Sequence, residues 1–153
     1  MRLLVARVGK GRNAWADQAV EDYSRRIRQV RFEELLLRPA VFRGEVEAVR
    51  SEEGARLLAA AGAGERLICL DERGELPTSE AFAGWIQQAI GEGAPGLVFG
   101  IGGPYGHAAV VRQRSWKVLA LGRWVTNHEI ARVVLVEQLY RASTLIWGGS
   151  YHH

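Results

Sequence analysis

The feature that most constrains this chain is the regular alternation of short apolar runs with segments of helical periodicity. The apolar runs read as strands, and the segments between them carry apolar residues three or four positions apart, as helices do. The predicted strands are residues 2–9, 32–41, 66–71, 96–101 and 116–121. The predicted helices are residues 14–29, 45–62 and 105–114, one that begins at Thr78 or Ser79, and one that begins near Thr126.

This alternation predicts an α/β fold, with a mainly parallel sheet and helices on both of its faces. A length of 153 residues suits one domain, 1–153, and no low-complexity stretch or linker divides it. The least regular part is residues 38–55, a polar stretch with two glycines that we interpret as a loop.

Composition excludes several classes of protein. No apolar run is long enough to cross a membrane, and the opening residues "MRLLVARVGKG" read as a first strand rather than a secretory signal. The single cysteine, Cys69, lies within an apolar run, so we expect a buried thiol and no internal disulfide. These features predict a cytoplasmic protein without a membrane partner.

Positive charge is concentrated toward the two ends of the chain. The net charge is +3 overall, and residues 51–100 alone are clearly acidic. All but two of the basic side chains are arginines, which suit bidentate contact with phosphate. Two interpretations stay open: a basic face that meets a polyanion, and a genome that favours arginine codons.

Three loops follow the carboxyl ends of predicted strands, where open α/β sheets bind ligands. They are "LDERGE" (70–75), "GIGGPYG" (100–106) and "LGRWVTNHE" (121–129). Glycine allows a backbone to approach a ligand closely, so Gly102 and Gly103 are candidate ligand contacts. The glycine spacing matches neither a dinucleotide-binding fingerprint nor a P-loop.

The last helix and the tail carry two further predictions. "TNHE" (126–129) matches a capping box with Thr126 as the cap. Four consecutive apolar residues, 133–136, point all round the helix, which predicts cover by a second subunit and therefore a homodimer. The chain ends in Tyr151, His152 and His153, read either as a frayed end or tag remnant, or as a tail that folds over a site and accepts a proton. No ligand spacing suggests a metal site.

Taken together, these residues resemble the RlmH family of the SPOUT methyltransferase superfamily along nearly the whole chain. The matching segments are "VG" followed by "WADQAVEDYSRRI" (15–27), "LICLDERG" (67–74), "IGGPYG" (101–106), "RSW" (114–116), "HEIARVVLVEQLYRA" (128–142) and the terminal "YHH". The last helix and the tail are the most specific of these.

The resemblance implies a SPOUT-type α/β domain with a C-terminal trefoil knot, an obligate homodimer and S-adenosylmethionine bound in the knot. It implies methylation of ring nitrogen 3 of a pseudouridine in 23S rRNA, on the assembled ribosome and without a metal. Two alternatives stay open: a related knotted methyltransferase acting on another rRNA or tRNA position, and a non-catalytic ribosome-binding factor.

The resemblance also suggests roles for individual residues. The candidate cofactor contacts are Leu70, Gly102, Gly103, Leu119, Leu121, Gly122, Trp124, Val125, Thr126 and Asn127. His152, Tyr151 and His128 are candidate catalytic residues, with the tail preferred because it can close after RNA docks. Arg25, Arg26 and Arg132 are candidate RNA contacts. The segment before His128 departs from the family, being about three residues longer and having Asn127 in place of a proline.

Overall fold

Strands and helices alternate along residues 1–151, the part of the chain that the computed structural model describes. The strands are β1 (Arg2–Val8), β2 (Arg31–Leu37), β3 (Arg66–Glu75), β4 (Gly96–Ile101) and β5 (Lys117–Leu119). The helices are α1 (Ala14–Ser24), α2 (Val46–Ala60), α3 (Ser79–Gly91), α4 (Ala109–Arg114) and α5 (His128–Trp147).

The five strands form one sheet in the order β2-β1-β4-β3-β5, and each pairs in parallel with its neighbours. The inner strands β1 and β4 are almost wholly buried, as expected of strands covered on both faces. The predicted α/β class with a parallel sheet is therefore confirmed. The C-terminal knot that the resemblance implies stays a prediction.

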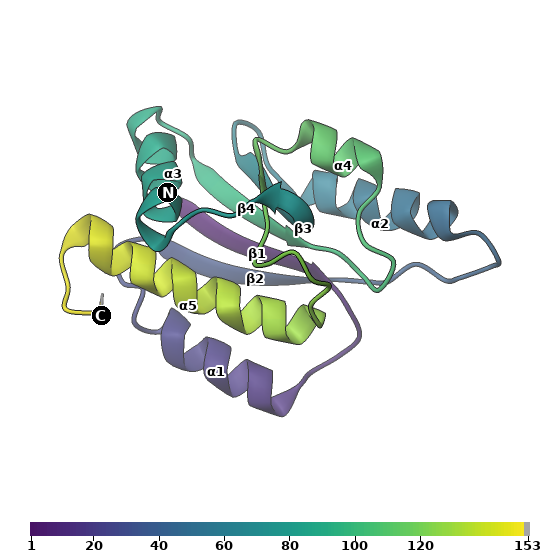
Figure 1. Cartoon of the computed structure of the whole chain (residues 1–153), viewed down its shortest axis with the longest axis horizontal. Coiled ribbons are helices and arrows are strands. Elements are labelled where there is room, and N and C mark those ends of the chain that lie inside the picture. The colour runs from purple at the N-terminus through teal and green to yellow at the C-terminus, as the bar shows by residue number, and fades with distance from the viewer. Residues whose placement is uncertain (152–153) are drawn as a thin grey trace.

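Helices α1, α3 and α5 cover one face of the sheet and α2 and α4 the other (Figure 1), and alternate side chains of the strands enter two separate cores. Leu3, Val5 and Phe99 pack with α1, α3 and α5 on one face. Leu4 and Val98 pack with α2 and α4 on the other face. The sheet is thus the middle of three layers, and helices cover both faces as predicted. Cys69 is fully buried in the second core.

Several predicted boundaries are corrected. The strand predicted at 32–41 ends at Leu37, and the helix predicted at 14–29 ends at Ser24. Within 38–55 only residues 38–45 form a loop, because α2 begins at Val46. The cap of the last helix is Asn127 rather than Thr126, because the Asn127 side chain accepts the hydrogen bond from Glu129 N.

Helix α5 connects the two ends of the molecule. It begins at the edge of the sheet where the carboxyl ends of the strands lie, and it ends beside the C-terminal tail at the opposite edge (Figure 1). A helix of 20 residues is about 30 Å long. No helix in the described part of the chain is long and apolar enough to cross a membrane.

Candidate functional site

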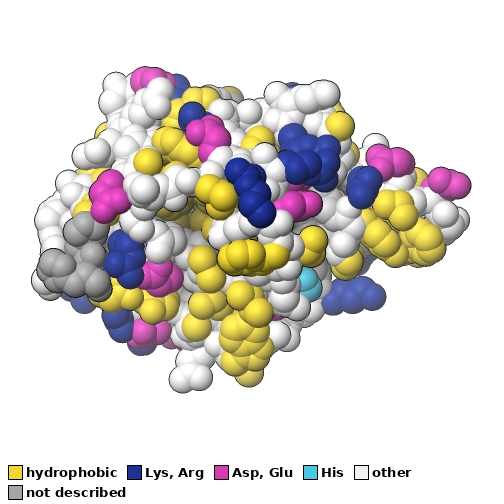
Figure 2. Space-filling model, viewed as in Figure 1, with side chains coloured by type: hydrophobic (Ala, Val, Ile, Leu, Met, Phe, Trp, Pro, Cys, Tyr) yellow, Lys and Arg dark blue, Asp and Glu magenta, His cyan; other side chains and the backbone are white. Residues whose placement is uncertain are grey.

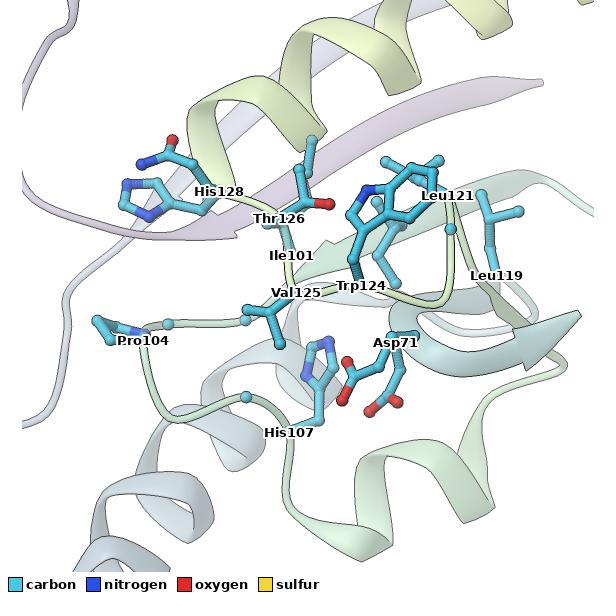
Figure 3. Close-up of a pocket in the computed structure, with 18 residues that line it drawn as sticks. Asp71, Ile101, Pro104, His107, Leu119, Leu121, Trp124, Val125, Thr126 and His128 are labelled. Atoms are coloured by element: carbon cyan, nitrogen blue, oxygen red, sulfur yellow. The ribbon is translucent and has the colours of Figure 1, made fainter. Parts of the chain in front are cut away.

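A pocket of about 280 Å³ opens at the carboxyl edge of the sheet (Figure 3). Three segments line it: residues 70–72 of β3, the glycine-rich loop after β4, and the segment between β5 and α5. The sequence predicts all three as ligand-binding loops, but residues 70–75 continue strand β3 to Glu75 instead of forming a loop. These segments lie close together because β4, β3 and β5 are adjacent and parallel, so their carboxyl ends lie at the same edge of the sheet.

All the residues predicted to contact the cofactor lie around this pocket. They are Leu70, Gly102, Gly103, Leu119, Leu121, Gly122, Trp124, Val125, Thr126 and Asn127. His128, the first residue of α5, lines the pocket as well. The structure therefore brings one proposed catalytic residue and every proposed cofactor contact together in one place.

The segment before α5 offers main-chain groups to this pocket. Among the described residues, the N–H groups of residues 121–126 donate to no main-chain carbonyl. Arg123 fixes this segment from outside, since its Nη1 donates to the carbonyl oxygens of Glu72 and Gly74 at 2.8 and 2.7 Å. A pocket wall with unpaired donors suits a planar heterocycle that presents hydrogen-bond acceptors.

The glycine-rich loop is packed too closely for side chains. A Cβ on Gly103 would lie 2.6 Å from Glu53 Oε2, and one on Gly102 would lie 3.2 Å from the His107 ring. Glu53 is buried, and its Oε1 accepts a hydrogen bond from Ala40 N at 3.0 Å. Burial raises the pKa of Glu53, and the hydrogen bond from Ala40 opposes this only in part.

A buried polar cluster forms one side of the pocket. His107 and Asp71 lie side by side there, with Val125 and Trp124 across from them (Figure 3). The carboxylate of Asp71 accepts hydrogen bonds from Arg73 N at 3.0 Å and from Arg112 Nη1 at 3.2 Å. The same Arg112 nitrogen donates to the His107 carbonyl at 2.9 Å.

The surroundings of Asp71 and His107 lower the pKa of both groups. Burial would raise the pKa of Asp71, but the Arg73 N–H and the guanidinium groups of Arg73 and Arg112 outweigh it and keep that pKa below its usual value. Burial lowers the pKa of His107, although the nearby Asp71 carboxylate opposes the shift, so the site favours the neutral ring. The His107 Nε2 atom is buried without a partner among the described residues. Neither side chain was predicted as a pocket residue, although Asp71 lies within the segment 70–75 and His107 directly follows the segment 100–106.

An ion-pair network supports the start of α5. Glu129 is buried and accepts hydrogen bonds from Arg7 Nη1 at 3.0 Å and from Arg132 Nη1 at 3.1 Å. Arg132 also donates to Glu34 at 2.7 Å and to Asp17 at 2.6 Å. The network ties β1, β2 and α1 to the first turn of α5, which carries His128 into the pocket.

This network corrects the interpretation of Arg132 as an RNA contact. Its side chain is only 4% exposed and already pairs with three carboxylates, so its guanidinium is not accessible to a phosphate. Arg25 and Arg26 are exposed near the end of α1, where both pair with Asp22. That end of α1 lies away from the pocket (Figure 1), and an RNA contact by these two residues stays a prediction.

Tyr151 lies beyond the far end of α5, not at the pocket of its own chain. Its ring packs against Tyr140 with the ring centroids 4.7 Å apart, and its hydroxyl is 3.5 Å from that of Tyr23. The hydrogen bond to Tyr23, together with burial and the nearby Glu137, raises the pKa of Tyr151 to about 12. In this position Tyr151 is a proton donor, not a base. His152 lies outside the described residues.

Fold and site together define an α/β protein with a pocket of small-molecule size at the carboxyl edge of a parallel sheet. Among residues 1–151, no group of three or more His, Cys, Asp or Glu side chains could hold a metal ion.

Comparison with known proteins gives the family. A family model described as "Predicted SPOUT methyltransferase" matches residues 1–152. Three similar proteins all carry the name "Ribosomal RNA large subunit methyltransferase H". The one from Geobacter sulfurreducens is 39% identical, with 100% of both chains aligned. The one from Geobacter sp. (strain M21) is 38% identical, over 100% of this chain and 99% of its own. The one from Nitratidesulfovibrio vulgaris (strain DP4) is 40% identical, over 99% of this chain and 97% of its own.

The chain belongs to the SPOUT methyltransferase family. The resemblance to its RlmH members, drawn from sequence motifs, is confirmed by these full-length relatives.

Proposed function

We propose that this protein is a cytoplasmic, homodimeric methyltransferase that transfers a methyl group from S-adenosylmethionine to ring nitrogen 3 of a pseudouridine in 23S rRNA of the assembled ribosome. One observation carries the proposal most directly. Every residue that the family resemblance assigns to the cofactor lies around a single pocket, in a chain whose full-length relatives are named as large-subunit rRNA methyltransferases.

The residues present fit this cofactor. Leu119 and Leu121 give the pocket an apolar wall suited to an adenine ring, and the free N–H groups of 121–126 suit its ring nitrogens. Gly102 and Gly103 line the pocket without side chains of their own, so the adenosyl group would lie against their backbone. A volume of about 280 Å³ is near the lower end for small-molecule pockets, so the ligand would be closely enclosed.

S-adenosylmethionine supplies, when bound, a methyl group on a positively charged sulfur. The chain itself has to hold the acceptor base in line, exclude water and take one proton from ring nitrogen 3. Trp124 and Val125 are 71% and 87% exposed beside the pocket, where they can cover an incoming base. His128 lines the same pocket, with its side chain 38% exposed, and can accept the proton.

The tail reaches a pocket only in a dimer. Tyr151 packs against Tyr140, which lies about 18 Å along α5 from the pocket residue His128. A tail that supplies His152 as a base, with Tyr151 positioning it, therefore acts on the partner's pocket. Helix α5 retains a suitable exposed apolar face, because Ile130 and Val134 are 48% and 39% exposed one turn apart.

The test uses ribosomes from a strain that lacks this gene. Purified protein and S-adenosylmethionine labelled on the methyl group should modify one pseudouridine of 23S rRNA, located by mass spectrometry of nuclease fragments. Assembled ribosomes should be modified faster than naked rRNA. Methylation of another nucleotide would support a related specificity instead, and no cofactor binding in calorimetry would support a non-catalytic ribosome-binding factor.

A further inference from the structure

An exposed aromatic pair lies beside the pocket, on residues that the proposed reaction does not use. Phe42 belongs to the loop 38–45 between β2 and α2, and Tyr105 belongs to the glycine-rich loop after β4. Their rings are stacked, with centroids 5.6 Å apart and an interplanar angle of 26°. Phe42 is 51% exposed and Tyr105 is 38% exposed, and the neighbouring Val41 is 69% exposed.

Main-chain contacts fix this pair relative to the pocket. Tyr105 stands between Pro104 and Gly106, both of which line the pocket. Arg50 Nε donates to the Tyr105 carbonyl at 2.7 Å. Glu53 lies between the two loops, because it accepts from Ala40 N on one side and lies against Gly103 on the other. The exposed rings are therefore held at a constant place next to the pocket mouth.

Unpaired cations gather at the same edge of the sheet. Six Lys and Arg side chains make no hydrogen bond or ion pair with any described residue: Lys10, Arg12, Arg28, Arg38, Arg43 and Arg114. Four of these six lie on just two loops, 9–13 and 38–45, which follow the adjacent strands β1 and β2. The two loops start side by side, since Gly9 N donates to the Leu37 carbonyl at 3.2 Å.

The charge of these loops is not neutralised locally. They contain four cations and a single acid, Glu45, so their net charge equals the +3 of the whole chain. Figure 2 shows hydrophobic and basic side chains next to one another at this end of the molecule. Stacking rings bordered by unpaired arginines are what proteins present to unpaired nucleotides, whose bases stack and whose phosphates need counter-charge.

We propose that this surface binds unpaired nucleotides of RNA that flank the target nucleotide. The docking surface consists of Val41, Phe42, Tyr105, Lys10, Arg12, Arg38 and Arg43. This inference rests on the proposed function and adds the place where the RNA docks. A second copy of the chain is the less suitable occupant, because a twofold interface here would bring these cations against their own copies.

The first experiment measures binding of a fluorescein-labelled single-stranded RNA by anisotropy, without cofactor, over a range of salt concentrations. Phe42→Ala should weaken binding about tenfold, the effect of losing one stacked base, and Phe42→Trp should restore it. The double variant R38Q/R43Q should reduce the slope of log Kd against log salt by about 1.4, corresponding to two lost phosphate contacts.

The matched control is R28Q/R114Q, which removes the same number of unpaired cations from the ends of α1 and α4. It should leave affinity and salt slope unchanged. The docking surface is wrong if both Phe42→Ala and R38Q/R43Q bind within twofold of the wild type, if the wild type binds no RNA, or if Phe42→Ala changes the oligomeric state in light scattering. Circular dichroism confirms that each variant is folded.

A second measurement separates this inference from the proposed function. With ribosomes as substrate, Phe42→Ala should raise KM while the calorimetric Kd for S-adenosylmethionine stays that of the wild type. A wild-type protein that binds RNA through Phe42 but transfers no methyl group would remove the proposed function and leave the docking surface intact. If the wild type transfers methyl groups normally and Phe42→Ala leaves KM unchanged, the docking surface is wrong and the proposed function stands.

Discussion

Gly103 in the glycine-rich loop lies against Glu53 of α2, with Glu53 Oε2 only 2.6 Å from the place where a Cβ on Gly103 would stand. The carboxylate cannot retreat easily, because it is buried and bound to Ala40 N. This contact joins the pocket floor to the loop that carries the docking surface. A substitution at either residue should therefore affect both the pocket and the docking surface.

Gly103→Ala should lower the free energy of unfolding by about 1–3 kcal/mol, the usual cost of overpacking, and should weaken cofactor binding. Urea denaturation and calorimetry measure the two effects. Gly84→Ala is the control, because Gly84 lies within α3 with open space at its Cβ position. That change should add about 0.5–1 kcal/mol of stability. Equal stability of the Gly103→Ala variant and the wild type would show that the contact is not tight.

Glu53→Gln should change how stability depends on pH. Burial raises the pKa of Glu53 in the folded state, so the folded protein binds a proton more readily than the unfolded chain. In the wild type, stability therefore falls as the pH rises from the unfolded pKa through the folded one. The uncharged side chain of the Glu53→Gln variant does not titrate, so the variant does not lose stability in this way.

The advantage of Glu53→Gln over the wild type should thus be greater at pH 7 than at pH 4. Thermal unfolding at the two pH values measures the difference. A constant difference between the two proteins would mean that Glu53 titrates as an exposed carboxyl does.

Arg132→Leu should destabilise the protein by about 3–5 kcal/mol, because Glu129 would lose a partner inside the core. The Arg132 guanidinium also lowers the pKa of Asp17, so part of the stability it provides is present above the ordinary Asp pKa and is lost as the pH falls through the lowered one. Arg114→Leu is the control, being exposed and unpaired among the described residues. A drop in RNA affinity with normal stability would contradict this structural role.

The strands and the site loops could be predicted because local pattern determines them. Apolar runs mark β1, β3 and β4, and the glycines after β4 mark a close approach of the backbone. The position of the helix cap was less determined, since Thr126 and Asn127 are adjacent and both residue types cap helices. The observed choice depends on which side chain reaches Glu129 N.

Long-range partners could not be predicted. Arg7 and Glu129 pair across 122 positions of the sequence, and nothing in local periodicity shows that a charged residue inside a strand meets one in the last helix. The stack of Phe42 on Tyr105 was missed for the same reason. Arg132 was a candidate RNA contact, and its sequence neighbours do not show the three carboxylates from separate elements that surround it.

Removal of residues 150–153 should abolish methyl transfer while leaving cofactor affinity unchanged, because Tyr151 packs against Tyr140, about 18 Å along α5 from the pocket of its own chain. Mixing the truncated protein with a second variant distinguishes a tail that acts on the partner's pocket from one that acts on the pocket of its own chain. The second variant is Gly122→Leu, whose side chain would occupy the position of the Trp124 ring at the pocket mouth. Each protein alone should be inactive.

In an equal, re-equilibrated mixture, half of the dimers are hybrids, and each hybrid combines one intact pocket with one intact tail from the other subunit. About a quarter of all sites should then become active if tails act across the dimer, as expected for a twofold assembly. A mixture that stays inactive, although light scattering or mass spectrometry shows hybrids, would contradict tail exchange and show that each tail acts on the pocket of its own chain. Full activity of the truncated protein alone would remove the tail from the mechanism, because the pocket would then need no residue beyond Gly149.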